Sequence, residues 1–166
     1  PMCLGRDEVA IFEGIHALSD RITALHPNAY RLYISARSNI ERDGALFFKG
    51  TWVRLTRRAI RDAQFRGADA QFTLSLWRNV RRGEKAHISP FKDTASLRLD
   101  TLIPYEISLM RGDALRIFSA VPPDFTGFGE LHALIAALTE FPPLDASLAP
   151  PDSMLREFIG GGIYEY

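Results

Sequence analysis

Residues 51–82 read TWVRLTRRAIRDAQFRGADAQFTLSLWRNVRR, and a helical pattern gives way to an alternating one within this stretch. Over residues 51–66, apolar side chains recur at helical spacing on one side, and arginines recur on the other. The apolar stripe is Trp52, Leu55, Ala59, Ile60 and Ala63, and the basic stripe is Arg54, Arg57, Arg58 and Arg61. The stripes lie about half a turn apart, so we expect a helix with its apolar face on a sheet and its arginines in water. Gly67 suits the left-handed backbone in which many helices end.

The residues after Gly67 alternate between apolar and polar side chains, which favours strands. We expect four strands of an antiparallel meander at residues 71–77, 96–100, 105–109 and 115–119, with Arg111-Gly112-Asp113 as a tight hairpin turn. Before the basic helix, Tyr30 to Ala36 alternates in the same way, although a helix fits it nearly as well. Asp43-Gly44 is a turn pair, so Ala45 to Lys49 is expected to return as a further strand.

Three more helices are expected to cover the sheet. Residues 7–25 carry Ile11, Ile15, Leu18, Ile22 and Leu25 at helical spacing, and residues 130–139 and 152–159 form the C-terminal helices. The sequence thus predicts an α+β fold: an antiparallel sheet of four to six strands with an N-terminal helix, the basic amphipathic helix and C-terminal helices packed on it. We expect a single domain over residues 2–159 and a flexible tail over residues 160–166.

Composition narrows the class of protein. A hydrophobic content of 46% and a charged content of 24% are those of a globular chain. No apolar run approaches the ~20 residues that a membrane span needs. The start of the sequence shows no secretory signal, and a single cysteine, Cys3, excludes disulfide scaffolds. These features predict a bacterial-type cytoplasmic protein without membrane contact.

Charge is distributed unevenly along the chain. The 20 Lys and Arg balance the 20 Asp and Glu overall, but residues 46–92 hold eleven basic and three acidic side chains, whereas residues 93–166 hold four and eleven. Such asymmetry within one chain indicates an anionic partner for the basic segment, or neutralisation of that segment by the acidic one in the fold. Both alternatives are open.

A second basic cluster follows the first and makes a binding function the preferred interpretation. We expect non-enzymatic binding of nucleic acid or of an acidic protein partner, with Trp77 close enough to stack on bases. The candidate binding residues are Arg54, Arg57, Arg58, Arg61, Arg78, Arg81, Arg82 and Lys85.

No signature of a catalytic, metal or cofactor site occurs in the sequence, so no such residues are assigned. Arg78, Arg81, Arg82, Glu84, Lys85 and His87 nevertheless supply cations, a carboxylate and an imidazole, which are the groups that metal-independent RNA cleavage requires. A metal-independent ribonuclease of toxin type is therefore the alternative. A third possibility is an inhibitor or immunity protein that binds one macromolecule, for which the sequence offers no positive signature.

Overall fold

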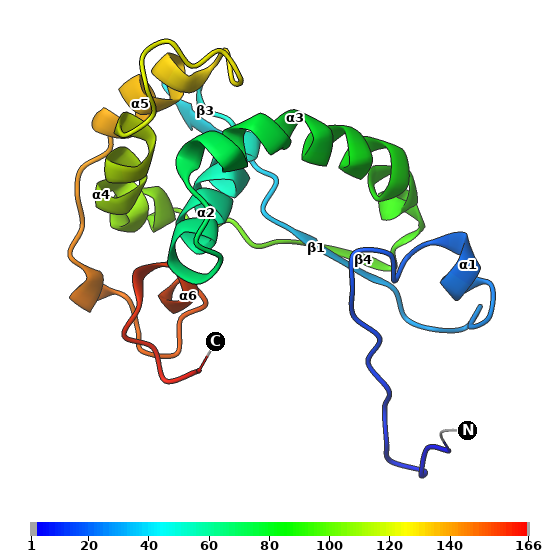
Figure 1. Ribbon diagram of the computed structural model, residues 1–166. Coiled ribbons are helices and arrows are strands. Elements are labelled where there is room, and N and C mark those ends of the chain that lie inside the picture. Colours follow the sequence, from blue (N-terminus) through cyan, green and yellow to red (C-terminus); the bar gives the residue numbers. More distant parts are fainter. Residues whose placement is uncertain (1–2, 166) are drawn as a thin grey trace. The chain divides into compact units, whose positions relative to one another are not determined.

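The computed structural model describes residues 3–165 and shows two compact units, which are described separately (Figure 1). The N-terminal unit consists of the residues up to Ile34 together with Arg81–Leu99. The core unit consists of Ser35–Val80 and the residues from Asp100 onward. One helix, α3, supplies residues to both units.

The core unit is built on four complete helices and the first part of α3, and it contains the whole hydrophobic core. Helix α2 (Gly50–Phe65) contacts α4 (Glu106–Ser119) and α6 (Arg156–Ile159), and α4 packs beside α5 (Leu131–Thr139), as Figure 1 shows. A short 3-10 helix, η2 (Ala146–Leu148), lies between α5 and α6. Trp52, Leu55 and Ile60 are buried as the apolar stripe of α2 predicts. The predicted helices at 51–66 and 130–139 are confirmed, whereas only the last turn of 152–159 is helical.

A β-hairpin precedes α2. Strand β2 (Ile40–Arg42) pairs antiparallel with β3 (Ala45–Phe48), with a bulge between Ile40 and Glu41. Asp43 and Gly44 both have positive φ, 52° and 76°, as a tight two-residue turn requires. The predicted turn and returning strand are therefore confirmed.

Helix α3 (Ala70–His87) replaces the strand expected at residues 71–77. Its buried side chains are Thr73, Leu74, Trp77 and Glu84, whose spacing is helical, whereas Phe72 is 56% exposed. Seven residues of alternation fit either structure. Glu84 is buried two turns after Trp77, which shows that the helical period continues beyond this run.

Helix α4 likewise replaces two expected strands and the hairpin between them. Ile107, Met110, Ala114 and Phe118 are fully buried and recur at helical spacing. Gly112 lies inside the helix without positive φ, so Arg111-Gly112-Asp113 is not a turn. The core contacts of this face, rather than the local alternation of side chains, decide the conformation.

A second small sheet has most of its residues in the N-terminal unit. Strand β1 (Leu32–Ser35) pairs with β4 (Leu97–Asp100). The N–H of Leu97 donates to the carbonyl of Arg31, and the N–H of Thr101 donates to the carbonyl of Ser35. The donors and acceptors advance in the same direction along both strands, so the strands run parallel. Helix α1 (Asp20–Thr23) and the 3-10 helix η1 (Ser89–Thr94) complete the unit. The fold is therefore α+β, but with two sheets of two strands each; the predicted antiparallel sheet of four to six strands is wrong.

The expected N-terminal helix over residues 7–25 is wrong as well, because only Asp20–Thr23 is helical. Gly14 has φ of 145°, which no α-helix accommodates, and Ile11 is 88% exposed. An amphipathic helix whose apolar face has nothing to pack on is marginal in water. Within residues 3–165, no helix has the length and apolar character needed to cross a bilayer.

Candidate functional site

The arginines of α2 do not form an open cationic surface. Arg57 is only 9% exposed, and its guanidinium forms a two-point ion pair with Glu106 of α4, which is fully buried. Its Nε donates to Oε1 of Glu106 at 3.1 Å, and its Nη2 donates to Oε2. The same Nη2 donates to the main-chain carbonyl of Thr101 at 2.7 Å. The expectation that Arg57 faces water is therefore wrong.

The Glu106 carboxylate is fully buried, and it accepts hydrogen bonds from Arg57 and from the N–H of Ile103. Burial disfavours its charged form and raises its pKa, whereas the hydrogen bonds and charge of Arg57 and the N–H of Ile103 act in the opposite direction; the net pKa lies above its ordinary value. The phenyl ring of Phe158 lies 5.6 Å from Cζ of Arg57 and helps to close the site. This pair joins α2 to α4 and is not open to a ligand.

The other α2 arginines also have partners. Nε of Arg58 lies 3.2 Å from Oδ2 of the buried Asp62, and Nε of Arg61 donates to Oε1 of Glu157 at 2.5 Å. Arg54 is half-buried and makes an interaction of its own. Glu106 and Glu157 belong to the acidic segment after residue 92. That segment therefore neutralises part of the basic one, which is one of the two alternatives left open by the sequence.

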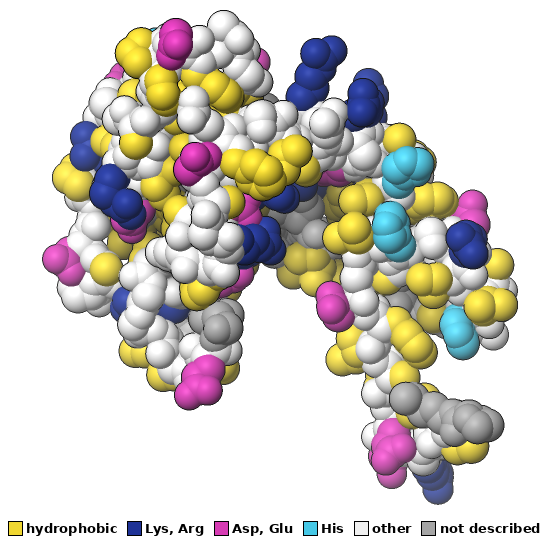
Figure 2. Space-filling model, in the orientation of Figure 1, with side chains coloured by type: hydrophobic (Ala, Val, Ile, Leu, Met, Phe, Trp, Pro, Cys, Tyr) yellow, Lys and Arg dark blue, Asp and Glu magenta, His cyan; other side chains and the backbone are white. Residues whose placement is uncertain are grey.

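Arg78, Arg82 and Lys85, in contrast, are exposed. They recur at i, i+4 and i+7 along α3 and so form one line, which we call the α3 basic stripe. None of the three forms an ion pair with another residue of the described chain 3–165. Figure 2 shows Lys and Arg side chains standing out from the outer side of α3. Of the eight candidate binding residues, these three are the ones available to a partner.

The remaining residues of the second cluster do not converge on a catalytic centre. Nη1 of Arg81 donates to Oε2 of Glu84 at 2.5 Å, and Glu84 is buried, with 7% of its surface exposed. His87 is exposed and lies about half a turn around α3 from the stripe. Trp77, expected to stack on bases, is buried in the core unit. In the part of the chain that the structure describes, no group of His, Cys, Asp or Glu could hold a metal ion.

The N-terminal unit exposes large apolar side chains, and three of them, Ile11, Ile15 and Leu25, belong to the stripe that was expected to pack inside the protein. Val9 is 85% exposed, Ile11 88%, Phe12 65%, Ile15 72% and Leu25 73%. We call these five residues the N-terminal apolar set. Figure 2 shows hydrophobic side chains gathered on the part of the molecule that carries α1. The signal for Ile11, Ile15 and Leu25 in the sequence is the helical spacing within residues 7–25; Val9 and Phe12 lie outside that stripe.

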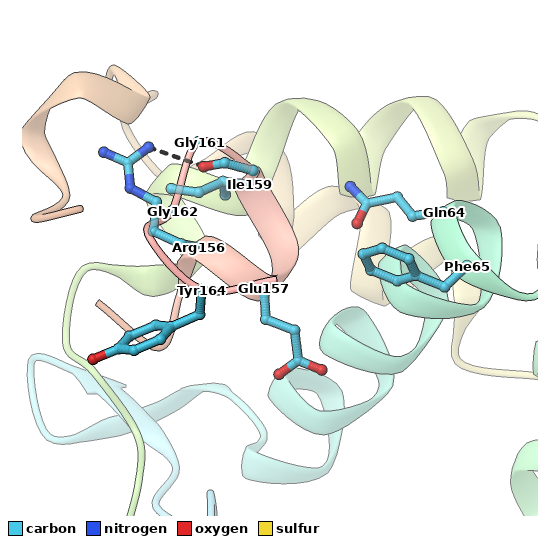
Figure 3. Close-up of a pocket in the computed structure, with 9 residues that line it drawn as sticks. Gln64, Phe65, Arg156, Glu157, Ile159, Gly161, Gly162 and Tyr164 are labelled. Carbon is cyan, nitrogen blue, oxygen red and sulfur yellow. Dashed lines mark hydrogen bonds between the residues drawn. The ribbon is translucent and has the colours of Figure 1, made fainter. Parts of the chain in front are cut away.

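A shallow cavity of about 370 Å³ lies in the core unit and is a further candidate site (Figure 3). Its lining includes Gln64, Phe65, Arg156 and Tyr164. The Arg156 guanidinium donates to the carbonyls of Gly160 at 3.0 Å, of Pro150 at 3.2 Å and of Ala149. Arg156 therefore serves to hold the chain around α6, and the cavity gathers no set of free polar groups.

The protein has an α+β fold, and its candidate binding groups are the α3 basic stripe and the N-terminal apolar set rather than the lining of an enclosed pocket. Comparison with known proteins finds no matching family model, no similar curated protein and no similar solved structure. Its function must therefore be inferred from its own surface.

Proposed function

We propose that this protein is a non-enzymatic binding protein that takes an acidic protein partner on its N-terminal unit. The contact consists of the N-terminal apolar set together with Arg82 and Lys85 of the α3 basic stripe. The observation that carries this proposal is the exposure of the apolar set, from 65% for Phe12 to 88% for Ile11. Large apolar groups left in water on one part of a protein mark interaction surfaces.

The same residues favour a protein over a nucleic acid. Arg57 and Arg61 of α2 pair with acidic residues of the same chain, so the α3 basic stripe is left with few cations for phosphates. Affinity for nucleic acid is built from many neutralised phosphates, and a few cations give only a small part of it. The buried Trp77 offers no face for base stacking. Large apolar side chains together with charged ones are the usual composition of a protein–protein interface. The single cysteine, Cys3, suits a cytoplasmic setting for this contact.

Capture experiments with charge-reversed protein test the proposal. The Arg82→Glu/Lys85→Glu variant should bind its acidic partner, isolated from a nuclease-treated lysate, roughly tenfold more weakly, because each change replaces an attraction at the rim by a repulsion. An Ile15→Ser/Leu25→Ser variant should lose capture without losing thermal stability, since both side chains are exposed. Arg116→Glu is the matched control, because Arg116 is also an exposed cation and lies on α4 of the core unit.

Two results contradict the proposal. One is binding that disappears after nuclease treatment and returns with added RNA or DNA, which assigns the stripe to nucleic acid. The other is a captured partner whose affinity is the same for wild type and for the Arg82→Glu/Lys85→Glu and Ile15→Ser/Leu25→Ser variants.

A further inference from the structure

Strands β1 and β4 form a sheet that is unfinished at its edges and on one face. Among residues 3–165, no other strand pairs with either of them. Isolated two-stranded sheets are marginally stable in water, and parallel sheets are normally covered on both faces. The pairing of Leu97 with Arg31 and of Thr101 with Ser35 places four apolar side chains on one face. These are Leu32, Ile34, Leu97 and Leu99, and each is between 42% and 55% exposed.

The register of this sheet also shows which main-chain groups point outward from β4. Leu97 and Thr101 donate to β1, and backbone groups of successive residues in a strand point to opposite sides. The N–H and C=O groups of Arg98 and Asp100 therefore point away from β1, toward the open edge of β4. Such an edge is a template for one more strand.

The charges on β4 decide how two copies of this edge can meet. Antiparallel self-pairing about Arg98 would oppose two arginines, and self-pairing about Asp100 would oppose two aspartates; like charges directly opposite each other are destabilising. Self-pairing about Leu99 opposes Arg98 of each chain to Asp100 of the other, and Leu99 to Leu99. In this register the outward groups of Arg98 and Asp100 are also those that bond across the edge.

Both charges are present and accessible. The Arg98 side chain is 60% exposed, and its Nη1 holds Asp93 at 2.7 Å, which leaves the other donors of the guanidinium for a second carboxylate. Partial burial alone would raise the pKa of Asp100, but hydrogen bonds from the Ser38 hydroxyl and from the N–H groups of Leu102, Arg37 and Ser38 outweigh it, so this pKa lies below its ordinary value. Asp100 therefore stays anionic, and its attraction to a facing guanidinium is coulombic.

We propose that this edge is a self-association surface at which β4 of one chain pairs antiparallel with β4 of a second copy, with the two-fold axis through Leu99. The resulting sheet has the order β1-β4-β4-β1. It satisfies the outward main-chain groups of both strands and joins the two apolar faces into one. The surface is separate from the α3 basic stripe and the N-terminal apolar set.

Sedimentation velocity across a concentration series measures the association. Wild type should show a concentration-dependent dimer, and Arg98→Glu should weaken that dimer by roughly tenfold, because it turns two attractive pairs into repulsive ones. Arg116→Glu is the matched control: Arg116, like Arg98, is an exposed arginine bound to a nearby aspartate, Asp113, at 2.8 Å. It should leave the dimer unchanged.

Cysteine cross-linking measures the register. In a Cys3→Ser background, the Leu99→Cys variant should form an interchain disulfide on mild oxidation, because facing residues of a non-hydrogen-bonded pair lie within disulfide reach. The Leu97→Cys variant faces Thr101 of the other chain and should cross-link much more slowly. A chain that stays monomeric at every concentration, a dimer insensitive to Arg98→Glu, or equal cross-linking of the two cysteine variants would each overturn the proposal.

Discussion

Arg57 and Glu106 place opposite charges inside the apolar core where α2 meets α4. Their pairing is complete: the carboxylate also accepts the N–H of Ile103, and the guanidinium also donates to Thr101. Removing two charges from water costs several kcal/mol per ion, which such a pair offsets only with full hydrogen bonding. The pair therefore serves mainly to fix how α2 packs against α4, and it adds little to the free energy of unfolding.

Removal of one partner is expected to be costly. Arg57→Ala should lower the free energy of unfolding by about 3–5 kcal/mol at neutral pH, because it leaves the Glu106 charge buried without a counterion. Urea unfolding measures the loss. Arg78→Ala, at an exposed position of α3, should change stability by less than about 0.5 kcal/mol. Equal, small effects of the two changes would show that Arg57 is not buried against Glu106.

The loss should also depend on pH. The folded state holds the Glu106 proton more tightly than the unfolded chain, so this group favours folding below its ordinary pKa of 4.5, and that contribution is lost as pH rises through the raised pKa. The hydrogen bonds and charge of Arg57 lower the pKa of Glu106 and so act against this rise, and Arg57→Ala removes that effect. The stability difference between wild type and variant should therefore grow from acidic to neutral pH.

Among the structural elements, α3 and α4 show how one pattern supports two conformations. Both helices contain short runs in which apolar and polar residues alternate, as strands do. In each helix, the side chains that are buried follow the helical period instead: Leu74 and Trp77 in α3, and Met110 and Ala114 in α4. The contacts of α4 with α2 and α5 select the helix, because only that conformation buries these residues together.

Glycine substitutions distinguish the two conformations of α4. Gly112→Ala should stabilise the protein by about 0.5–1 kcal/mol, because alanine favours the helix and no atom lies within 4 Å of the added Cβ. Thermal unfolding measures the change. If residues 111–113 formed a hairpin turn, the same substitution would destabilise the protein.

Gly50→Ala is the control for this prediction. Gly50 opens α2, and a Cβ there would lie 2.4 Å from the main-chain oxygen of Arg37. This substitution should destabilise the protein although it also replaces glycine by alanine in a helix. The opposite signs follow from the space around each position and not from helix propensity.

At the scale of the whole molecule, burial is concentrated in one unit. Every member of the hydrophobic core lies in the core unit, whereas the buried residues of the N-terminal unit are Thr23, Tyr33 and Glu84. A unit with so little buried apolar surface has little stability of its own. Most residues of the two proposed binding surfaces therefore lie in the part of the chain that is easiest to reorganise.

Hydrogen exchange tests this division. Amides of residues 3–34 should exchange through local opening, whereas those of Val53, Ile60 and Met110 should exchange only on global unfolding, because these three residues are fully buried in the core helices. Exchange measured by mass spectrometry over a denaturant series separates the two regimes. Equal protection of both units would contradict the assignment of stability to the core unit.

Local patterns in the sequence determined the elements whose cause is local. The opposed stripes of α2 predict a helix with Trp52, Leu55 and Ile60 inside, and Asp43-Gly44 predicts the β2–β3 turn; both are confirmed. Gly67 was expected in left-handed geometry and has φ of 59°. In each case, the spacing or backbone freedom of neighbouring residues is sufficient to fix the conformation.

Only the tertiary structure decided which charges remain free and which apolar faces are covered. Arg57 and Glu106 are 49 residues apart, and Arg61 and Glu157 are 96 apart, so no window of sequence shows that they pair. The helical spacing of Ile11, Ile15 and Leu25 describes an apolar face but not the surface that would cover it, and within this chain that face stays exposed. An ion pair or a buried face is a property of two segments at once, and the distance between them in space is set by the packing of the whole chain.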